Sequence, residues 1–334
     1  MTRTTVSRST PTISQVASAA GVSRSSVSRA FSRPELLGKE TVERILAVAR
    51  DIGYVPNHTA RALSTGRYSN IALVVPDVAN PFFPPIIEGA QAEADQSDFC
   101  VFLGNSGESP RHEDALLDRF MGQVEGVVLV SSRLSEARIR HHAARKPIVL
   151  VNRDVKGLAR VLIDSSQGVE QAVVHLNELG HRRIAYVAGP AQSWSNRQRR
   201  ATVVRVSKRL GLAVTVIPTP VPSYAAGVAA AKQIIKSSVT AAVAFDDLTA
   251  QGVMAGLAEQ GLTVPSDMSV IGCDDVLGAS TYPAMTSVSS RSAEAGKAAV
   301  SLLLDFLSGS SLGDARLALD THLVMRQTTL APAT

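Results

Sequence analysis

The segment Thr12–Phe31 reads TISQVASAAGVSRSSVSRAF, and its pattern predicts two short helices separated by a tight turn. Thr12 and Gln15 stand three residues apart, which is the spacing of a capping box at the start of a helix. Apolar residues follow at helical spacing as far as Gly21, and Ser23 can cap the second helix. A break of about three residues that contains glycine is typical of a helix-turn-helix motif.

A third amphipathic helix is predicted from about Lys39 to Gly53, so that three short helices can bury one small core. The second helix would expose Arg24 and Arg29, and an arginine can bond a guanine edge through two hydrogen bonds in the major groove. Small hydroxyl groups such as that of Ser28 suit phosphate oxygens. The pattern favours a DNA-reading head; the alternative is a three-helix protein-interaction module with a solvated Arg/Ser face.

The positive charge of the 334-residue chain is concentrated in its first fifth. Residues 1–70 hold ten Lys and Arg against four Asp and Glu, whereas residues 71–334 hold twenty-four against twenty-five. The net charge of +5 therefore comes from the segment that carries the three predicted helices. This asymmetry is expected of a small nucleic-acid-binding unit joined to a nearly neutral body.

Two stretches resemble the lactose-repressor (LacI/GalR) family. Val16–Phe31 is similar to the DNA-reading unit of that family, and GYVPNHTARALSTG (Gly53–Gly66) is similar to its hinge; the resemblance covers essentially residues 12–330. It implies that Asn57–Thr65 form a hinge helix that orders on operator DNA, with Leu63 as an apolar wedge in a minor-groove step. The side chains predicted to contact DNA are Thr12, Ser23, Arg24, Ser25, Ser26, Ser28, Arg29, Ser32, Thr41, Tyr54, Asn57, Ala60 and Leu63.

The rest of the sequence alternates short apolar runs with helical patterns. Fully apolar strands separated by helices predict parallel sheets covered on both faces, and eight such runs exceed one ordinary open sheet. The resemblance implies two doubly wound α/β lobes like those of a periplasmic sugar-binding protein. The predicted strands are Ile71–Val75, Cys100–Leu103, Gly126–Val130, Ile148–Val151, Ile184–Val187, Ala213–Ile217, Ala241–Phe245 and Ser269–Gly272.

These patterns divide the chain into four expected parts. They are a disordered arm (1–11), an all-α helix-turn-helix head (12–56), a hinge helix and linker (57–69), and an effector-binding and dimerising α/β body (70–330). Within the body, lobe 1 is expected at about 70–163 and 291–322, and lobe 2 at about 164–290 and 323–330. The expected crossovers are Ile163–Asp164, Ser290–Ser292 and Thr321–Leu323.

Polar residues follow the predicted strands, where open parallel sheets bind their ligands. They are Asp77, Asn80, Asn105, Ser131, Ser132, Asn152, Arg153, Asp246, Asp247, Asp274 and Asp275. Carboxylates, amides and arginine supply the donors and acceptors that fit a sugar, and Phe82 and Phe83 add aromatic surface at one strand end.

The resemblance narrows this set. It implies that Arg199, Asp246 and Asp274 contact a small-molecule effector, with Asn152 lying opposite. Arg199 and Asp274 could instead form a buried structural ion pair, and Trp194 could stack on a sugar or be an ordinary lobe aromatic. Asp247 and Asp275 are interpreted as helix caps or backbone anchors, and His181 as structural. The predicted effector site is Asn80, Phe82, Phe83, Asn152, Trp194, Arg199, Asp246 and Asp274.

The sequence contains no convincing catalytic or cofactor motif. Gly309–Gly313 matches GxSxG only formally, because a helical pattern at Glu294–Leu307, and not a strand, precedes it. His112-Glu113 lacks the second histidine of HExxH, since Leu116 takes that position, and there is no glycine-rich phosphate loop. We therefore expect no enzyme activity, no cofactor and no metal.

The sequence also has no apolar run near the roughly 18 residues of a membrane span, and its N-terminus has no secretory pattern. Together these features predict a cytoplasmic homodimeric repressor that binds a pseudo-palindromic double-stranded operator, responds to a sugar and does not contact a membrane. A solute-binding transport protein with the same body is the first alternative, and the basic head and missing secretory signal count against it. A sugar-modifying enzyme is the second.

Overall fold

The computed structural model describes residues 11–55, 68–311 and 313–333, and the chain divides into two compact units, Met1–Tyr68 and Ser69–Thr334. The first unit packs three helices around fully buried Val16, Val27 and Ile45. Its helices are α1 (Ile13–Ala20), α2 (Arg24–Ser32), the short 3-10 turn η1 (Pro34–Leu36) and α3 (Lys39–Asp51).

The caps that the sequence predicts for this unit are confirmed. Gln15 Oε1 accepts a hydrogen bond from the Thr12 amide at 2.7 Å, while the Thr12 side chain accepts from the Gln15 amide, so the capping box is reciprocal. Gly21 ends α1 with a φ of 63°, a left-handed conformation that glycine adopts without strain. Ser23 then starts α2, because its Oγ accepts from the Ser26 amide at 3.0 Å.

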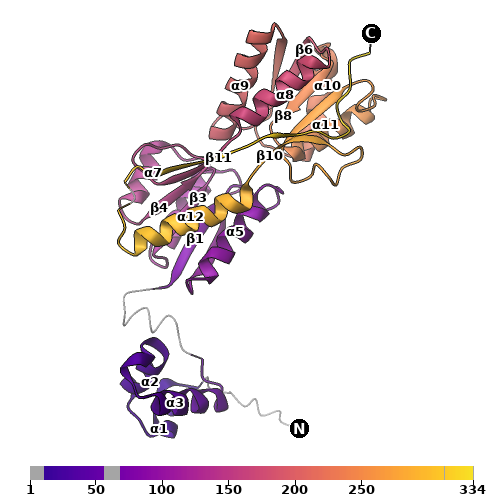
Figure 1. The fold of residues 1–334 in the computed structure, drawn as a ribbon. Helices are drawn as coiled ribbons and strands as arrows, with labels where there is room; N and C mark the ends of the chain where they lie inside the picture. Colours follow the sequence, from indigo (N-terminus) through magenta and orange to yellow (C-terminus); the bar gives the residue numbers. More distant parts are fainter. Residues whose placement is uncertain (1–10, 56–67, 312, 334) are drawn as a thin grey trace, which may run out of the picture. The chain divides into compact units, whose positions relative to one another are not determined.

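The second unit contains two six-stranded sheets, each covered by helices on both faces (Figure 1). The sheet of lobe 1 is wholly parallel, in the order β11 (Arg316–Asp320), β5 (Arg160–Asp164), β4 (Ile148–Val151), β3 (Gly126–Val130), β1 (Asn70–Val75) and β2 (Cys100–Asn105). Its helices are α5 (Phe83–Asp95) and α12 (Ser292–Leu307) on one face, and α6 (Pro110–Phe120) and α7 (Glu136–Ala143) on the other.

Lobe 2 repeats this arrangement, with one short antiparallel strand at its edge. Its strand order is β12 (Leu323–Val324), β10 (Thr286–Ser289), β9 (Ser269–Asp274), β8 (Ala241–Ala244), β6 (Arg183–Ala188) and β7 (Ala213–Pro218). Its helices are α8 (Ser166–Glu178) and α9 (Trp194–Leu210) on one face, and α10 (Tyr224–Lys236) and α11 (Asp247–Ala258) on the other. The predicted fold class, a helical head and a two-lobed α/β body, is confirmed.

All eight predicted strands form, and four further strands have no strong apolar signal. β5 and β11 each begin with Arg and end with Asp. β11 is also an edge strand, and most of its residues are exposed. β10 reads Thr-Ser-Val-Ser, and its hydroxyl groups are tolerated in the interior because they find partners there. Ser287 Oγ, for example, donates to Asp247 at 2.5 Å. Periodicity cannot reveal such a strand, because its burial depends on partners distant in sequence.

The chain passes between the lobes three times. It crosses after β5, again between β10 and α12, and finally between β11 and β12. Hydrogen bonds tie these crossovers to the sheets: Ser290 Oγ donates to the Asp274 carbonyl at 2.7 Å, and Thr321 Oγ1 donates to the Asp164 carbonyl at 3.1 Å. No helix of the described residues is long and apolar enough to span a membrane.

Two helix pairs pack so closely that a glycine is required at each contact. In lobe 2 a Cβ on Gly252 of α11 would lie 2.0 Å from the Tyr224 carbonyl oxygen of α10, and one on Gly227 would lie 2.2 Å from the Thr249 oxygen. Gly296 of α12 meets α5 in the same way in lobe 1, at 2.1 Å from the Ile86 oxygen. Because the obstacles are backbone atoms, the helices must move apart to admit a methyl group.

We expect Gly252→Ala to lower the free energy of unfolding of the body by about 1–3 kcal/mol, the usual cost of overpacking. Gly122→Ala is the matched control, because a Cβ there would meet nothing within 4 Å. Urea denaturation of both variants measures the difference. A Gly252→Ala protein as stable as the control would contradict the close packing of α10 on α11.

Candidate nucleic-acid interface and ligand cavity

Helix α2 presents an exposed, basic, hydroxyl-rich surface. Arg24, Ser25, Ser28 and Arg29 are exposed, while Val27 and Ala30 on the other side of the helix are buried in the head. Arg24 is the first residue of the helix, next to backbone N–H groups that have no partner in the helix itself. Such a helix has the shape and chemistry to enter a major groove and bond base edges.

The other predicted DNA contacts differ in their surroundings. Ser23 Oγ caps α2, and Ser32 Oγ donates to the Ser28 carbonyl at 2.8 Å, so these hydroxyls also serve the helix. Tyr54 packs against Phe31 with ring centroids 5.8 Å apart. Thr12 is exposed, whereas Ser26 and Thr41 are half-buried. Asn57, Ala60 and Leu63, with the predicted hinge helix, lie outside the described residues.

A cavity lies between the carboxyl ends of strands from both lobes. Its empty space is about 360 Å³, including the part that is open to solvent. Lobe 1 lines it with Asn80, Phe82, Phe83, Glu108, Ser131 and Arg133, and lobe 2 with Ser193, Ser195, Arg199, Pro222, Phe245, Asp246 and Asp274. Six of the eight predicted effector residues are therefore brought together, from segments up to 194 positions apart in sequence.

Arg199 and Asp274 form a buried ion pair at this cavity. Arg199 Nη2 donates to Asp274 Oδ1 at 2.7 Å, and the two side chains are only 5% and 4% exposed. Arg199 also donates to Ser165 Oγ at 3.3 Å and to the Phe245 carbonyl, and its guanidinium lies 5.2 Å from the Phe245 ring centroid. The ion pair of the second alternative is therefore present, and both residues also line the cavity.

The Asp274 carboxylate is held in an unfavourable environment. Burial raises the pKa of Asp274 to about 6, although the charge of Arg199 opposes this rise. The backbone of Asp274 has a φ of 102°, a region that residues other than glycine rarely adopt. Strained backbone of this kind persists where the surrounding fold enforces it, often at functional sites.

Asp246 and Asn80 connect the two lobes across the cavity. Asn80 Nδ2 donates to Asp246 Oδ2 at 2.9 Å, and the Asp246 Oδ1 accepts from the Thr249 amide at 2.8 Å as the cap of α11. Asn80 is fixed in turn, because its Oδ1 accepts from the Phe82 amide at 3.0 Å. A ligand that competes for either partner would therefore change a bond between lobes.

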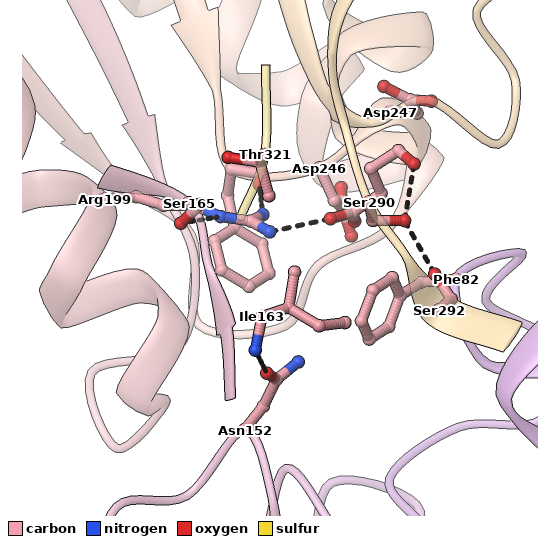
Figure 2. Close-up of polar contacts among 12 residues, drawn as sticks. Phe82, Asn152, Ile163, Ser165, Arg199, Asp246, Asp247, Ser290, Ser292 and Thr321 are labelled. Atoms are coloured by element: carbon pink, nitrogen blue, oxygen red, sulfur yellow. Dashed lines mark hydrogen bonds and ion pairs between the residues drawn. The ribbon is translucent and has the colours of Figure 1, made fainter. Parts of the chain in front are cut away.

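Two predicted effector residues do not line the cavity. Asn152 is buried, and its Oδ1 accepts from the Ile163 amide at 2.9 Å, so the side chain braces neighbouring strand ends (Figure 2). Trp194 is the half-buried first residue of α9. Its neighbours line the cavity instead: Ser193, the N-cap of α9, and Ser195 in its first turn.

The cavity also contains residues that were not predicted as effector contacts. The sequence indicates Ser131 only as a polar strand-end residue, and it gives no effector prediction for Glu108, Arg133, Ser193, Ser195, Pro222 and Phe245. Most of them lie in loops beyond strand ends, where hydrophobic periodicity gives no information. Glu108 and Arg133 each stand three residues after a strand end, which is the only signal that could have marked them.

Asp247, Asp275 and His181 have the structural roles expected of them, although Asp275 anchors a side chain. Asp247 Oδ2 accepts from the amides of Val276 and Leu277 at 2.8 and 3.0 Å, and burial together with the charge of Asp274 raises the pKa of Asp247 to about 7. Asp275 pairs with Arg326 at 2.6 Å. The His181 ring bonds Thr240 Oγ1, Ser269 Oγ and the Leu330 carbonyl.

Comparison with known proteins gives consistent matches over both units. Residues 12–57 match the family described as "Bacterial regulatory proteins, lacI family", and residues 173–329 match a "Periplasmic binding protein-like domain". The HTH-type transcriptional repressor CytR of Escherichia coli (strain K12) is 31% identical over 329 residues, covering 96% of each protein. The HTH-type transcriptional regulator CelR of Thermobifida fusca is 31% identical over 339 residues, covering 96% of this chain and 98% of CelR.

Two solved structures extend these matches. The lac repressor dimer bound to operator and the anti-inducer ONPF aligns with a TM-score of 0.87 at 25% identity, over 97% of this chain and 100% of that one. The complex of the regulator CelR with cellobiose aligns with a TM-score of 0.72 at 30% identity, over 95% and 99% of the two chains.

Proposed function

The chain belongs to the lacI family of bacterial regulatory proteins, and we propose that α2 binds an operator while a sugar in the interlobe cavity controls that binding. The protein is a DNA-binding transcriptional regulator. The observation that carries the effector proposal is the buried Arg199–Asp274 pair in a cavity that also exposes Phe82, Phe83 and Phe245. Charged hydrogen-bonding groups beside aromatic rings fit a ligand with hydroxyl groups on its rim and an apolar face.

The partners follow from the same reasoning. A related repressor is a dimer on its operator, and a related regulator is in complex with cellobiose. We propose a homodimer whose two heads contact the halves of a pseudo-palindromic operator, because protein two-fold symmetry is mirrored in the DNA site. A DNA partner of this kind favours action in the cytoplasm.

The relatives are regulators, which favours a regulatory role over an enzymatic one. The segment that precedes the GxSxG-like sequence is helix α12, and a nucleophile elbow requires a strand there. A transport role is disfavoured by the reading head, for which a solute carrier has no use.

We expect Arg29→Ala to weaken operator binding by about 1–3 kcal/mol and to relax the base preference at one position. Arg50→Ala is the control, because it removes the same charge from the exposed C-terminal turn of α3. A selection of binding sites from random DNA, followed by titration of the selected operator, measures both effects. Unchanged preference in Arg29→Ala would remove this side chain from base readout.

The effector half is tested by calorimetry with a set of neutral sugars, followed by operator titration with and without the sugar that binds. We expect Asp274→Asn to lower the affinity for that sugar about tenfold or more, since it removes a charge-assisted hydrogen bond. Asp118→Asn is the control at an exposed ion pair. If Asp274→Asn binds the sugar as the wild type does, Asp274 is not part of the effector site.

A further inference from the structure

A second buried ion pair lies at the cavity, contributed by lobe 1. Arg133 Nε and Nη2 donate to the two carboxylate oxygens of Glu108 at 2.6 and 3.0 Å. The side chains of Arg133 and Glu108 are 5% and 12% exposed. Each lobe therefore presents one arginine–carboxylate pair to the same space, Glu108–Arg133 from lobe 1 and Asp274–Arg199 from lobe 2.

The lobe 1 pair is fixed by its own supporting contacts. Arg133 Nη1 donates to the Ser131 carbonyl at 2.7 Å, and the Arg133 amide donates to Glu113 Oε2 at 2.9 Å. Glu113 is almost fully buried and also accepts from Ser132 Oγ. Glu108 and Ser131 both have left-handed backbones, with φ of 59° and 47°. Such conformations are uncommon for residues other than glycine and are maintained here at the cavity wall.

The hydrogen-bonding capacity left in this pair selects between ligand classes. Arg133 uses three of its five N–H groups, and each Glu108 oxygen accepts one bond and retains acceptor capacity. A hydroxyl group can donate to the carboxylate while its neighbour accepts from the guanidinium. A phosphate dianion or a carboxylate has no hydrogen to donate, so it would meet the negative charge of Glu108.

The charges of the whole cavity favour the same class. Three carboxylates, Glu108, Asp246 and Asp274, face two arginines, and each arginine is already paired with one of them. Neither arginine offers an uncompensated charge to an anion. A ligand without charge and with neighbouring hydroxyl groups satisfies both pairs without breaking them.

We propose, building on the sugar-effector function above, that Glu108–Arg133 is a second recognition pair that bonds neighbouring hydroxyls of the effector and excludes phosphorylated or carboxylated sugars. The pair sets specificity beside the Arg199–Asp274 pair of lobe 2. Glu108→Gln unpairs Arg133 with little change in shape, so this variant should lose hydroxyl recognition and gain affinity for anions.

The test compares neutral and anionic partners: glucose with glucose 6-phosphate, ribose with ribose 5-phosphate, and cellobiose with cellobionate, together with inorganic phosphate alone. Binding is followed by calorimetry and by the melting midpoint, against sodium chloride of equal ionic strength, because phosphate also stabilises proteins non-specifically. Glu136→Gln is the matched control, since it unpairs Arg140 at an exposed ion pair of the same lobe.

We expect the wild type to bind a neutral sugar and to bind neither its anionic partner nor inorganic phosphate. Glu108→Gln should bind the neutral sugar about tenfold more weakly and should acquire saturable binding of inorganic phosphate, which Glu136→Gln should not. Arg133→Lys keeps the positive charge but cannot form the bidentate hydrogen bond. This variant should therefore bind the sugar more weakly and should not bind phosphate. This variant and the wild-type comparison decide the question if Glu108→Gln does not fold.

Wild-type binding of an anionic sugar at least as tight as that of its neutral partner would overturn the proposal. So would Glu108→Gln that binds sugars and phosphate as the wild type does while Asp274→Asn loses the sugar; the effector site would then stand and only this pair would be excluded. If no sugar binds the wild type, the sugar-effector function fails, and the phosphate response of Glu108→Gln still reports on the pair.

Discussion

An Arg199→Met variant is expected to have a free energy of unfolding about 3–5 kcal/mol lower than that of the wild type. This is the usual result of removing one partner of a buried ion pair. The substitution keeps much of the side-chain volume and leaves the Asp274 carboxylate, 4% exposed, without its cation. The deficit should be smaller at pH 5 than at pH 8, because an unpaired buried carboxyl takes up a proton at the lower pH. Urea denaturation at both pH values measures it.

The double variant Arg199→Met/Asp274→Asn separates charge from packing. It removes both charges, so it should recover much of the stability that Arg199→Met loses. Arg145→Met is the control at an exposed pair, with side chains about half exposed, and should change stability by less than about 1 kcal/mol. A double variant no more stable than Arg199→Met would show that the lost contacts to Phe245 and Ser165, and not the orphaned charge, cause the deficit.

Asp247→Asn should stabilise the body at alkaline pH. The pKa of Asp247 is about 7 in the folded protein, against an ordinary value of 3.8. A raised carboxyl pKa contributes stability below about pH 4 that is lost as the pH rises through 7. The variant cannot ionise, so its advantage should grow as the pH rises from about 4 to 7 and level off above pH 7, with an upper bound of about 4 kcal/mol.

The amide of the variant can keep the local bonds. Its oxygen can accept from the amides of Val276 and Leu277, and its NH₂ group can donate to the Ser287 hydroxyl. Unfolding at pH 4, 6 and 8, with Asp118→Asn as an exposed control, gives the pH profile of the difference. A variant less stable than the wild type at pH 8 would mean that the ionised carboxylate is required.

The helical head shows what local sequence can predict. Its helices, caps and turn depend on residues within a few positions of each other, such as Thr12 with Gln15 and Ser23 with Ser26. The buried parallel strands can also be predicted from local sequence, because a strand covered on both faces is continuously apolar. The strands β10 and β11 cannot, since partners from distant segments decide whether a polar or half-exposed strand forms.

The sequence by itself determined the helical head, its reading surface and the two-lobed class of the body, and resemblance identified Arg199, Asp246 and Asp274. Only the tertiary structure decided which strand-end residues share one cavity. In the structure Glu108 and Arg133 line the cavity, whereas Asn152 accepts a hydrogen bond from the Ile163 amide. The physical reason is that caps and periodic faces are short-range properties of the chain. The direction of a loop side chain is set by backbone conformation and partners far away in sequence, as with the left-handed Glu108 and its partner 25 positions away.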